Sequence, residues 1–290
     1  MSESQTQPDS EKLAQVIVNI VIPPCPKIVM ALVQEAHQEE PDLAKLDKLL
    51  SGDVGLAAAV IKTANSPYYG LNRKVQAVKQ ALLVLGIRAV TNIVTLLALQ
   101  KALAGSAANL DRFWDRTNYH AIVCARLAKY LRFVSTDGAY TFGLFNDCGM
   151  PILIQRFPDY KETLRLANTA DRPFVEVENE RHQTSHALVG SMLAQSWQLP
   201  EIICKAIRDH HCMELLYEKT SDAQGDVGAL AAISLIADYV VNDFLSAKQE
   251  AEWEQHGGQA MSFLGFGVEE LSEIKLDITD ELEEARSYRL

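Results

Sequence analysis

Ionisable side chains recur where the sequence predicts the buried faces of helices. His120 falls within an apolar stripe that contains Thr117 and Cys124, and Asp147 follows Leu144 at helical spacing. The side chains that share this kind of placement are His120, Asp147, His186, His210 with its neighbour His211, and Asp238. We expect them to point into one interior.

Buried histidines and aspartates need partners, because an unpaired neutral polar group costs about 1–3 kcal/mol and a charge costs more. For any single histidine, a hydrogen-bonded core position is the ordinary interpretation. Several together favour a shared polar site. Since imidazole and carboxylate groups are ligands for Mn, Fe, Zn or Mg, and facing helices can hold them, a divalent metal ion is the candidate cofactor. No short motif such as HExxH supports it.

The elements that must position these residues are helices. Helical periodicity dominates, and alternating strand patterns bounded by turns are nearly absent, which predicts an all-α protein. Asp53 is suited to cap a helix that ends at Asn65. The other helices that we expect cover residues 11–18, 27–38, 43–50, 87–103, 111–133, 137–147, 151–157, 160–170, 184–197, 200–211 and 226–245.

The pattern of helices and connections divides the chain into four parts. Residues 1–18 form a tail with a short helix, 19–108 a first helical half, 109–245 a second helical half, and 246–290 an acidic helical extension. The connection GSAAN at 105–109 marks the boundary between the halves. The last 23 residues carry eight acidic and three basic side chains, which is typical of a solvated helix or a tail.

Composition excludes several classes of protein. The net charge of −11 argues against nucleic acid and anionic membranes as partners. The most apolar stretch, residues 81–103, is interrupted by Arg88 and is too short between charges to span a bilayer. The polar N-terminus is no signal peptide, and five cysteines without a CxxC pair indicate reduced thiols. We therefore expect a cytoplasmic location.

The charge is distributed unevenly. Residues 54–110 contain six basic side chains and no acidic one, whereas the rest of the chain has 21 basic and 38 acidic. Within this stretch, an expected loop places Tyr68 and Tyr69 beside Arg73 and Lys74. Aromatic and basic side chains together suit an acidic partner protein or a nucleotide ligand. The alternative is that the stretch lacks acids because most of it is buried.

Two strings in the first half carry a resemblance to a known family. Residues 51–70 read SGDVGLAAAVIKTANSPYYG and residues 78–94 read VKQALLVLGIRAVTNIV, preceded by Pro23-Pro24-Cys25-Pro26. In these strings the chain resembles HDOD proteins, the HD-related output domains of bacterial signal transduction. The resemblance covers about residues 21–212. It implies an N-terminal helical bundle packed on a degenerate HD-domain-like helical bundle.

The second half resembles the HD phosphohydrolase core, which holds divalent metal with His, a His-Asp pair and a distant Asp. By this resemblance, His120 matches the first histidine, Asn146-Asp147 the His-Asp pair and Asp238 the final aspartate. His186 and His210 or His211 match the additional histidines of two-metal members. These assignments imply a metal-binding set that consists of His120, Asn146, Asp147, His186, His210, His211 and Asp238.

Two departures from the HD pattern bear on activity. Asn146 replaces an imidazole by a weak oxygen donor, and Met150 replaces a lysine that would meet a substrate phosphate. The leading hypothesis is therefore a non-catalytic signal-transduction module that binds a protein partner. The alternative is a divergent metal-dependent phosphohydrolase acting on a nucleotide or cyclic dinucleotide, with Asp147 as the catalytic residue. A third hypothesis is a small-molecule sensor that uses the polar interior as a pocket.

Overall fold

The computed structural model describes residues 20–65, 74–104, 110–131, 134–170, 172–217, 223–249 and 251–287. Every regular element in these ranges is a helix, so the expected all-α class is confirmed. The helix expected at 11–18 and the residues Tyr68, Tyr69 and Arg73 lie outside the described residues.

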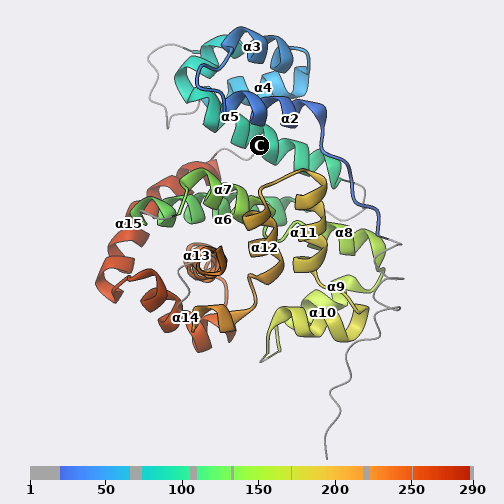
Figure 1. Ribbon diagram of the computed structural model, residues 1–290, viewed down its shortest axis with the longest axis vertical. Coiled ribbons are helices and arrows are strands. Elements are labelled where there is room, and N and C mark those ends of the chain that lie inside the picture. Colours follow the sequence, from blue (N-terminus) through green and yellow to red (C-terminus); the bar gives the residue numbers. More distant parts are fainter. Residues whose placement is uncertain are drawn as a thin grey trace, which may run out of the picture. The chain divides into compact units, whose positions relative to one another are not determined.

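The chain divides into two compact units. Unit 1 comprises Met1–Pro23 and Gly105–Leu276, and unit 2 comprises Pro24–Ala104 and Asp277–Leu290. Unit 2 contains α2 (Lys27–Ala36), α3 (Leu43–Ser51), α4 (Val54–Ala64) and α5 (Val78–Ala102), drawn from blue to teal in Figure 1. Asp53 caps α4, because its side chain accepts the backbone N–H groups of Gly55 and Leu56.

Helix α5 corrects the helix expected at 87–103. It begins nine residues earlier, at Val78, and runs through a break at Gly86, where φ is 79° and ψ is 161°. This conformation is accessible to glycine and strained for other residues. The apolar side chains before Gly86 do follow one helical face, since Val78, Ala81 and Leu82 are buried while Leu83 and Val84 are exposed.

Unit 1 is built around α13 (Ala223–Phe244), which Figure 1 shows end-on with α6, α7, α12 and α14 around it. The residues between Ala229 and Ala237 on α13 are all buried. The other elements of unit 1 are α6 (Asp111–Tyr130), α7 (Thr136–Phe145), α8 (Gly149–Arg156), α9 (Tyr160–Ala167), α10 (Phe174–His182), α11 (His186–Ser196), α12 (Glu201–Asp209), the 3₁₀ helix η2 (Met213–Leu216) and α14 (Ala251–Leu264). Helix α15 (Val268–Ser287) gives its first residues to unit 1 and its remainder to unit 2.

Most helices of unit 1 lie where periodicity predicts them, with ends that differ by a few residues. Two were not predicted as separate helices: α10, where no helix was expected, and α14, which lies in the helical extension expected at 246–290. Both are polar segments with weak helical signals: α10 reads FVEVENERH, and α14 contains a Gly-Gly pair. Both turn out to contribute to the polar site described below.

Two helices are long and apolar enough to cross a membrane by length and composition alone. They are Val78–Ala102 and Gly225–Phe244. The first is broken at Gly86, and the most apolar window of the second is 78% buried within the protein, as for the core helix of a bundle. The same test is passed by many core helices, so it carries little weight here.

Candidate metal centre

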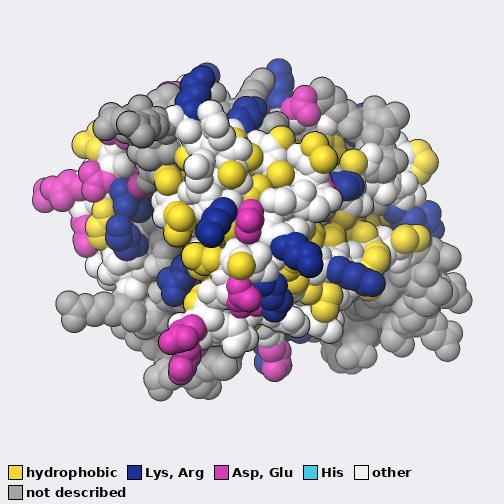
Figure 2. Space-filling view, turned by 90° about the horizontal axis from the view of Figure 1, so that it is seen from above, with side chains coloured by type: hydrophobic (Ala, Val, Ile, Leu, Met, Phe, Trp, Pro, Cys, Tyr) yellow, Lys and Arg dark blue, Asp and Glu magenta, His cyan; other side chains and the backbone are white. Residues whose placement is uncertain are grey.

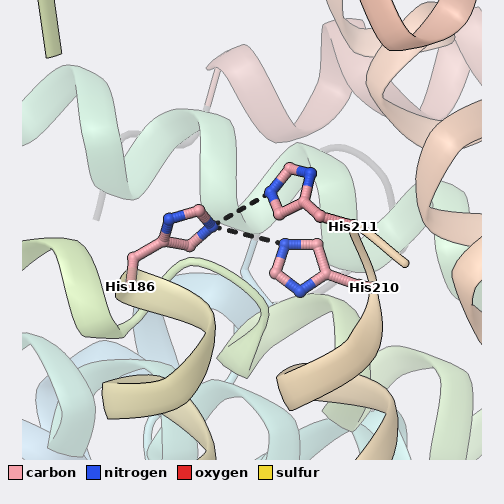
Figure 3. A group of neighbouring side chains, drawn as sticks. All are labelled: His186, His210 and His211. Atoms are coloured by element: carbon pink, nitrogen blue, oxygen red, sulfur yellow. Dashed lines mark hydrogen bonds between the residues drawn. The ribbon is translucent and has the colours of Figure 1, made fainter. Parts of the chain in front are cut away.

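Three histidines of unit 1 converge at the ends of two neighbouring helices. His186 is the first residue of α11, whose N-cap Ser185 accepts the backbone N–H of Leu188. His210 and His211 directly follow α12, which packs on α11. Figure 3 shows the three rings turned toward one another. One nitrogen of each lies within 4.8 Å of the others, and Nε2 of His186 is 3.4 Å from Nε2 of His210 and 3.1 Å from Nε2 of His211.

The opposite nitrogen of each ring faces a hydrogen-bond acceptor. Nδ1 of His186 is 2.7 Å from the Glu178 carboxyl, Nδ1 of His210 is 2.7 Å from the Ile207 carbonyl oxygen, and Nδ1 of His211 is 2.7 Å from the Glu252 carboxyl. Since a carbonyl or carboxylate oxygen only accepts, each Nδ1 must carry the proton. In the neutral rings, all three Nε2 atoms are then unprotonated.

Three unprotonated nitrogens cannot hydrogen-bond to one another. The short Nε2–Nε2 contacts drawn as dashed lines in Figure 3 would therefore place lone pairs against lone pairs unless a cation lies among them. Burial, followed by the neighbouring imidazoles, holds the pKa of His210 well below its ordinary value and so disfavours a second proton on this ring. A set of neutral imidazoles with fixed Nδ1–H tautomers is what a transition metal ion requires, so the residues fit such an ion.

Glu178 holds His186 in place from α10. Its side chain is fully buried and accepts hydrogen bonds from the Tyr160 hydroxyl and from the backbone N–H of His186, in addition to the imidazole. These donors satisfy a carboxylate. Sequence reasoning missed Glu178, because a glutamate in a polar helix is ordinarily exposed and nothing local reports its burial.

Glu252 does the same for His211 from α14. Only 8% of its side chain is exposed, and both carboxyl oxygens lie within 2.9 Å of Nδ1. Glu252 belongs to the extension that follows the expected HD-like half, and it was not a candidate in the sequence. The only local signal is an acidic residue in the first turn of a helix, which is more often solvated.

Asn146 and Asp147 reach the centre from the end of α7. Asp147 Oδ1 lies 3.4 Å from Nε2 of His186, so the carboxylate is positioned beside the three imidazoles. The backbone approach behind it requires glycine: a Cβ atom on Gly149 would lie 2.0 Å from the carbonyl oxygen of His186. Asn146 is buried, and its Oδ1 is one of the described buried atoms without a hydrogen-bond partner.

His120 and Asp238 form a separate cluster on the facing helices α6 and α13. Nε2 of His120 is 3.7 Å from Asp238 Oδ2, and Asp238 Oδ1 accepts a hydrogen bond of 2.7 Å from Arg116. Burial alone would lower the pKa of His120, but Cys124, Asp238 and Asp147 outweigh it and raise this pKa. His120 and Asp238 thus lie outside the group of three converging histidines. All seven expected ligands belong to unit 1.

A pocket of about 600 Å³ opens beside both clusters. Charged groups of either sign and two phenylalanines line it, together with Met150. The lining residues from the expected metal set are Asn146, Asp147, His210, His211 and Asp238, and the basic ones are Arg116, Arg172 and Lys248. Such a volume suits a small molecule.

Most of the second expected site, the loop with basic and aromatic residues, lies outside the described residues. Of its members the structure describes Lys74, which is exposed. In the same acid-free stretch of unit 2, Lys62 and Lys79 are also exposed. Figure 2, which views the molecule from above Figure 1, shows Lys and Arg side chains scattered among hydrophobic and acidic ones rather than merged into one patch.

Comparison with known proteins agrees with this fold. Residues 22–213 match the HDOD domain family. An uncharacterized protein of Treponema pallidum (strain Nichols) is 26% identical over 216 residues, which is 72% of this chain. The chain covers 41% of that relative's length.

Three solved structures share the fold over most of this chain. An HDOD domain protein of Geobacter sulfurreducens has a TM-score of 0.74 at 21% identity and covers 96% of this chain and 97% of its own. A candidate phosphohydrolase of Shewanella amazonensis SB2B has a TM-score of 0.70 at 22% identity, with coverages of 94% and 97%. A candidate signal transduction protein of Marinobacter aquaeolei VT8 has a TM-score of 0.73 at 20% identity, with coverages of 96% and 64%.

Proposed function

The chain belongs to the HDOD family, and from this premise we propose that it is a signal-transduction module that binds one or more divalent metal ions and does not turn over a substrate. The metal ion is bound by Nε2 of His186, His210 and His211, with the Asp147 carboxylate beside them. Zn, Mn or Fe suit imidazole ligands better than Mg does. A bound ion would supply the positive charge that the three facing lone pairs of these residues require.

One observation that supports the absence of turnover is that both arginines of the pocket are paired with carboxylates, which leaves Lys248 as the other basic residue of its lining. Arg116 is bound to Asp238 at 2.7 Å, and Arg172 is bound to Glu180 at 2.5 Å. A phosphoryl transfer site needs cations that are available to the substrate phosphate. Asn146 and Met150 also argue against turnover, since they replace an imidazole and a lysine of the HD pattern.

The partner that we propose is an acidic segment of another signalling protein in the cytoplasm, bound by unit 2. Support comes from the exposed Lys62, Lys74 and Lys79 in a stretch that contains no acidic residue. A further support is the name of one structural neighbour, which is a candidate signal transduction protein. Lys74→Glu with Lys79→Glu should weaken partner binding, and Lys129→Glu with Lys161→Glu, at two exposed positions of unit 1, is the matched control.

A metal-dependent phosphohydrolase is the second candidate, because Asp147, His210 and His211 line a pocket large enough for a nucleotide. A structural neighbour is itself named a candidate phosphohydrolase. In this case a metal-bound water would attack a phosphate ester in the pocket.

Metal content and turnover measured on one preparation separate the two candidates. The chain is purified without chelators, its metal is quantified, and hydrolysis of bis-p-nitrophenyl phosphate, nucleotides and cyclic dinucleotides is followed with Mn, Fe, Zn or Mg. We expect bound metal that His211→Ala removes, and no hydrolysis. Hydrolysis that depends on metal and is lost in Asp147→Ala would establish the phosphohydrolase instead. A chain that binds no metal would refute both candidates.

A further inference from the structure

Helices α6 and α13 face each other through a ladder of polar side chains spaced one helical turn apart. Arg116 and His120 are four residues apart on α6, and Ser234, Asp238 and Asn242 follow the same spacing on α13. The Arg116 guanidinium bridges two steps of this ladder, since it donates to Asp238 Oδ1 at 2.7 Å and to Asn242 Oδ1 at 2.5 Å. Asp238 is therefore already bound to a permanent cation of its own chain.

Both ring nitrogens of His120 already have neighbours within the chain. Its Nδ1 lies 3.3 Å from the Gly143 carbonyl oxygen and 3.6 Å from the Cys124 sulfur. Its Nε2 lies 3.3 Å from the Ser234 hydroxyl, 3.4 Å from the Ser234 carbonyl oxygen and 3.7 Å from Asp238 Oδ2. A ring nitrogen that is hydrogen-bonded within the chain must give up that partner before it can bind a metal ion.

The two ends of the polar interior thus differ in whether the chain itself already supplies a cation. The end formed by His186, His210 and His211 has three facing lone pairs, whereas the carboxylate at the other end, Asp238, is already paired with the Arg116 guanidinium. We infer that Arg116 takes the place of a second metal ion at Asp238, so that each chain binds a single ion at the three-histidine end. This inference rests on the proposed metal binding and sets its stoichiometry.

The first test counts ions in the full chain. Protein freed of metal is titrated with Zn²⁺ or Mn²⁺, and the bound metal is quantified after gel filtration. We expect one ion per chain. Two ions per chain in the unaltered protein would overturn the role of Arg116 and leave the proposed metal centre intact.

The second test removes the built-in cation. In Arg116→Met, the Asp238 carboxylate loses its cation and becomes available to a metal ion. We therefore expect two ions per chain, and one again when Asp238→Asn is added. Arg112→Met, an exposed position one turn earlier on α6, is the control and should bind one ion. A folded Arg116→Met chain that still binds one ion contradicts the inference.

The third test needs no variant and stands if Arg116→Met does not fold. Anomalous scattering from crystals of the unaltered chain grown with Zn²⁺ locates the ion directly. We expect one peak among the three Nε2 atoms, with Arg116 still bonded to Asp238. A peak at Asp238 would overturn this inference and leave the proposed three-histidine centre intact. The absence of any bound metal would refute both the proposed centre and the inference.

Discussion

Single carboxylates set the orientation of the imidazoles at the centre. Glu178 is shielded from solvent and receives hydrogen bonds from Tyr160 and from both the backbone and the ring of His186. A carboxamide has one acceptor oxygen and cannot satisfy all of these donors. The proton on Nδ1, and with it the free Nε2, therefore depends on Glu178 remaining a carboxylate.

We expect Glu178→Gln to weaken metal binding by about 10- to 100-fold, as for other partners that orient a metal-bound histidine. Competition with a chromophoric chelator measures this affinity. Tyr160→Phe keeps the carboxylate and should cause a smaller loss. Glu176→Gln, an exposed position on the same helix, should cause none. Equal affinities in the Glu178 and Glu176 variants would refute the role of Glu178.

Glu35 connects α2 to α3 in unit 2 and should make this connection sensitive to acid. Its carboxyl accepts hydrogen bonds from Lys45 at 2.6 Å and from the backbone N–H of Asp42 at 2.7 Å, and these lower its pKa, the lysine more than the amide. A lowered pKa contributes stability that is complete above the ordinary value of about 4.5 and is lost as the pH falls through the lowered one.

Glu35→Gln should therefore destabilise α2 and α3 more at pH 7 than at pH 3. Hydrogen exchange of the backbone amides of these helices measures the difference. Glu39→Gln, an exposed position beyond α2, is the matched control. A cost that is the same at both pH values would contradict the prediction.

At the scale of whole elements, the break in α5 depends on one glycine. Gly86 has a positive φ of 79° in a region where a Cβ atom is strained, although no neighbouring atom would clash with it. Gly258, by contrast, lies inside α14 with open space around it and is not among the residues with positive φ. The same substitution should therefore act in opposite directions at the two positions.

We expect Gly86→Ala to lower the free energy of unfolding by about 1–3 kcal/mol, the cost of a side chain in a sparsely populated conformation. Gly258→Ala should raise it by up to about 1 kcal/mol, because alanine favours the helix. Urea denaturation followed by far-UV circular dichroism measures both. If Gly86→Ala leaves stability unchanged, the break is not maintained by the backbone of Gly86.

The elements that could be predicted are those whose signals lie in the local sequence. Asp53 caps α4 as expected, because a cap needs only its own side chain and the next few N–H groups. His120 and His186 were identified because a histidine within an apolar stripe is visible along one helix. Glu178 and Glu252 were missed, because they lie in polar helices and are buried only by packing against other elements. The burial of the carboxylates that orient the imidazoles thus depends on tertiary packing, whereas most of the histidines can be recognised from the local sequence.

At the scale of the molecule, every proposed ligand lies in unit 1, and so do Trp114, Trp197 and Trp253, the three tryptophans of the chain. Tryptophan fluorescence therefore reports the unfolding of the unit that binds the metal. At a free metal concentration of 100 times Kd, the ion should stabilise this unit by about 2.7 kcal/mol. A chelator should lower the fluorescence midpoint in urea, and His211→Ala should abolish this shift. A midpoint that does not respond to metal in the unaltered chain would contradict the prediction.

The hydrogen bond between His211 and Glu252 spans the limit of the HDOD segment, which ends at residue 213. A ligand contact thus lies inside the family domain, and the carboxylate that orients it lies on a helix outside it. Binding at these two places is reciprocal: a partner that draws Glu252 away from His211 changes metal affinity by the same factor by which the metal ion changes the partner's affinity. Each 1.4 kcal/mol of that coupling free energy is tenfold in both constants. Through Glu252, helix α14 would therefore couple metal binding at the buried centre to the binding of a partner.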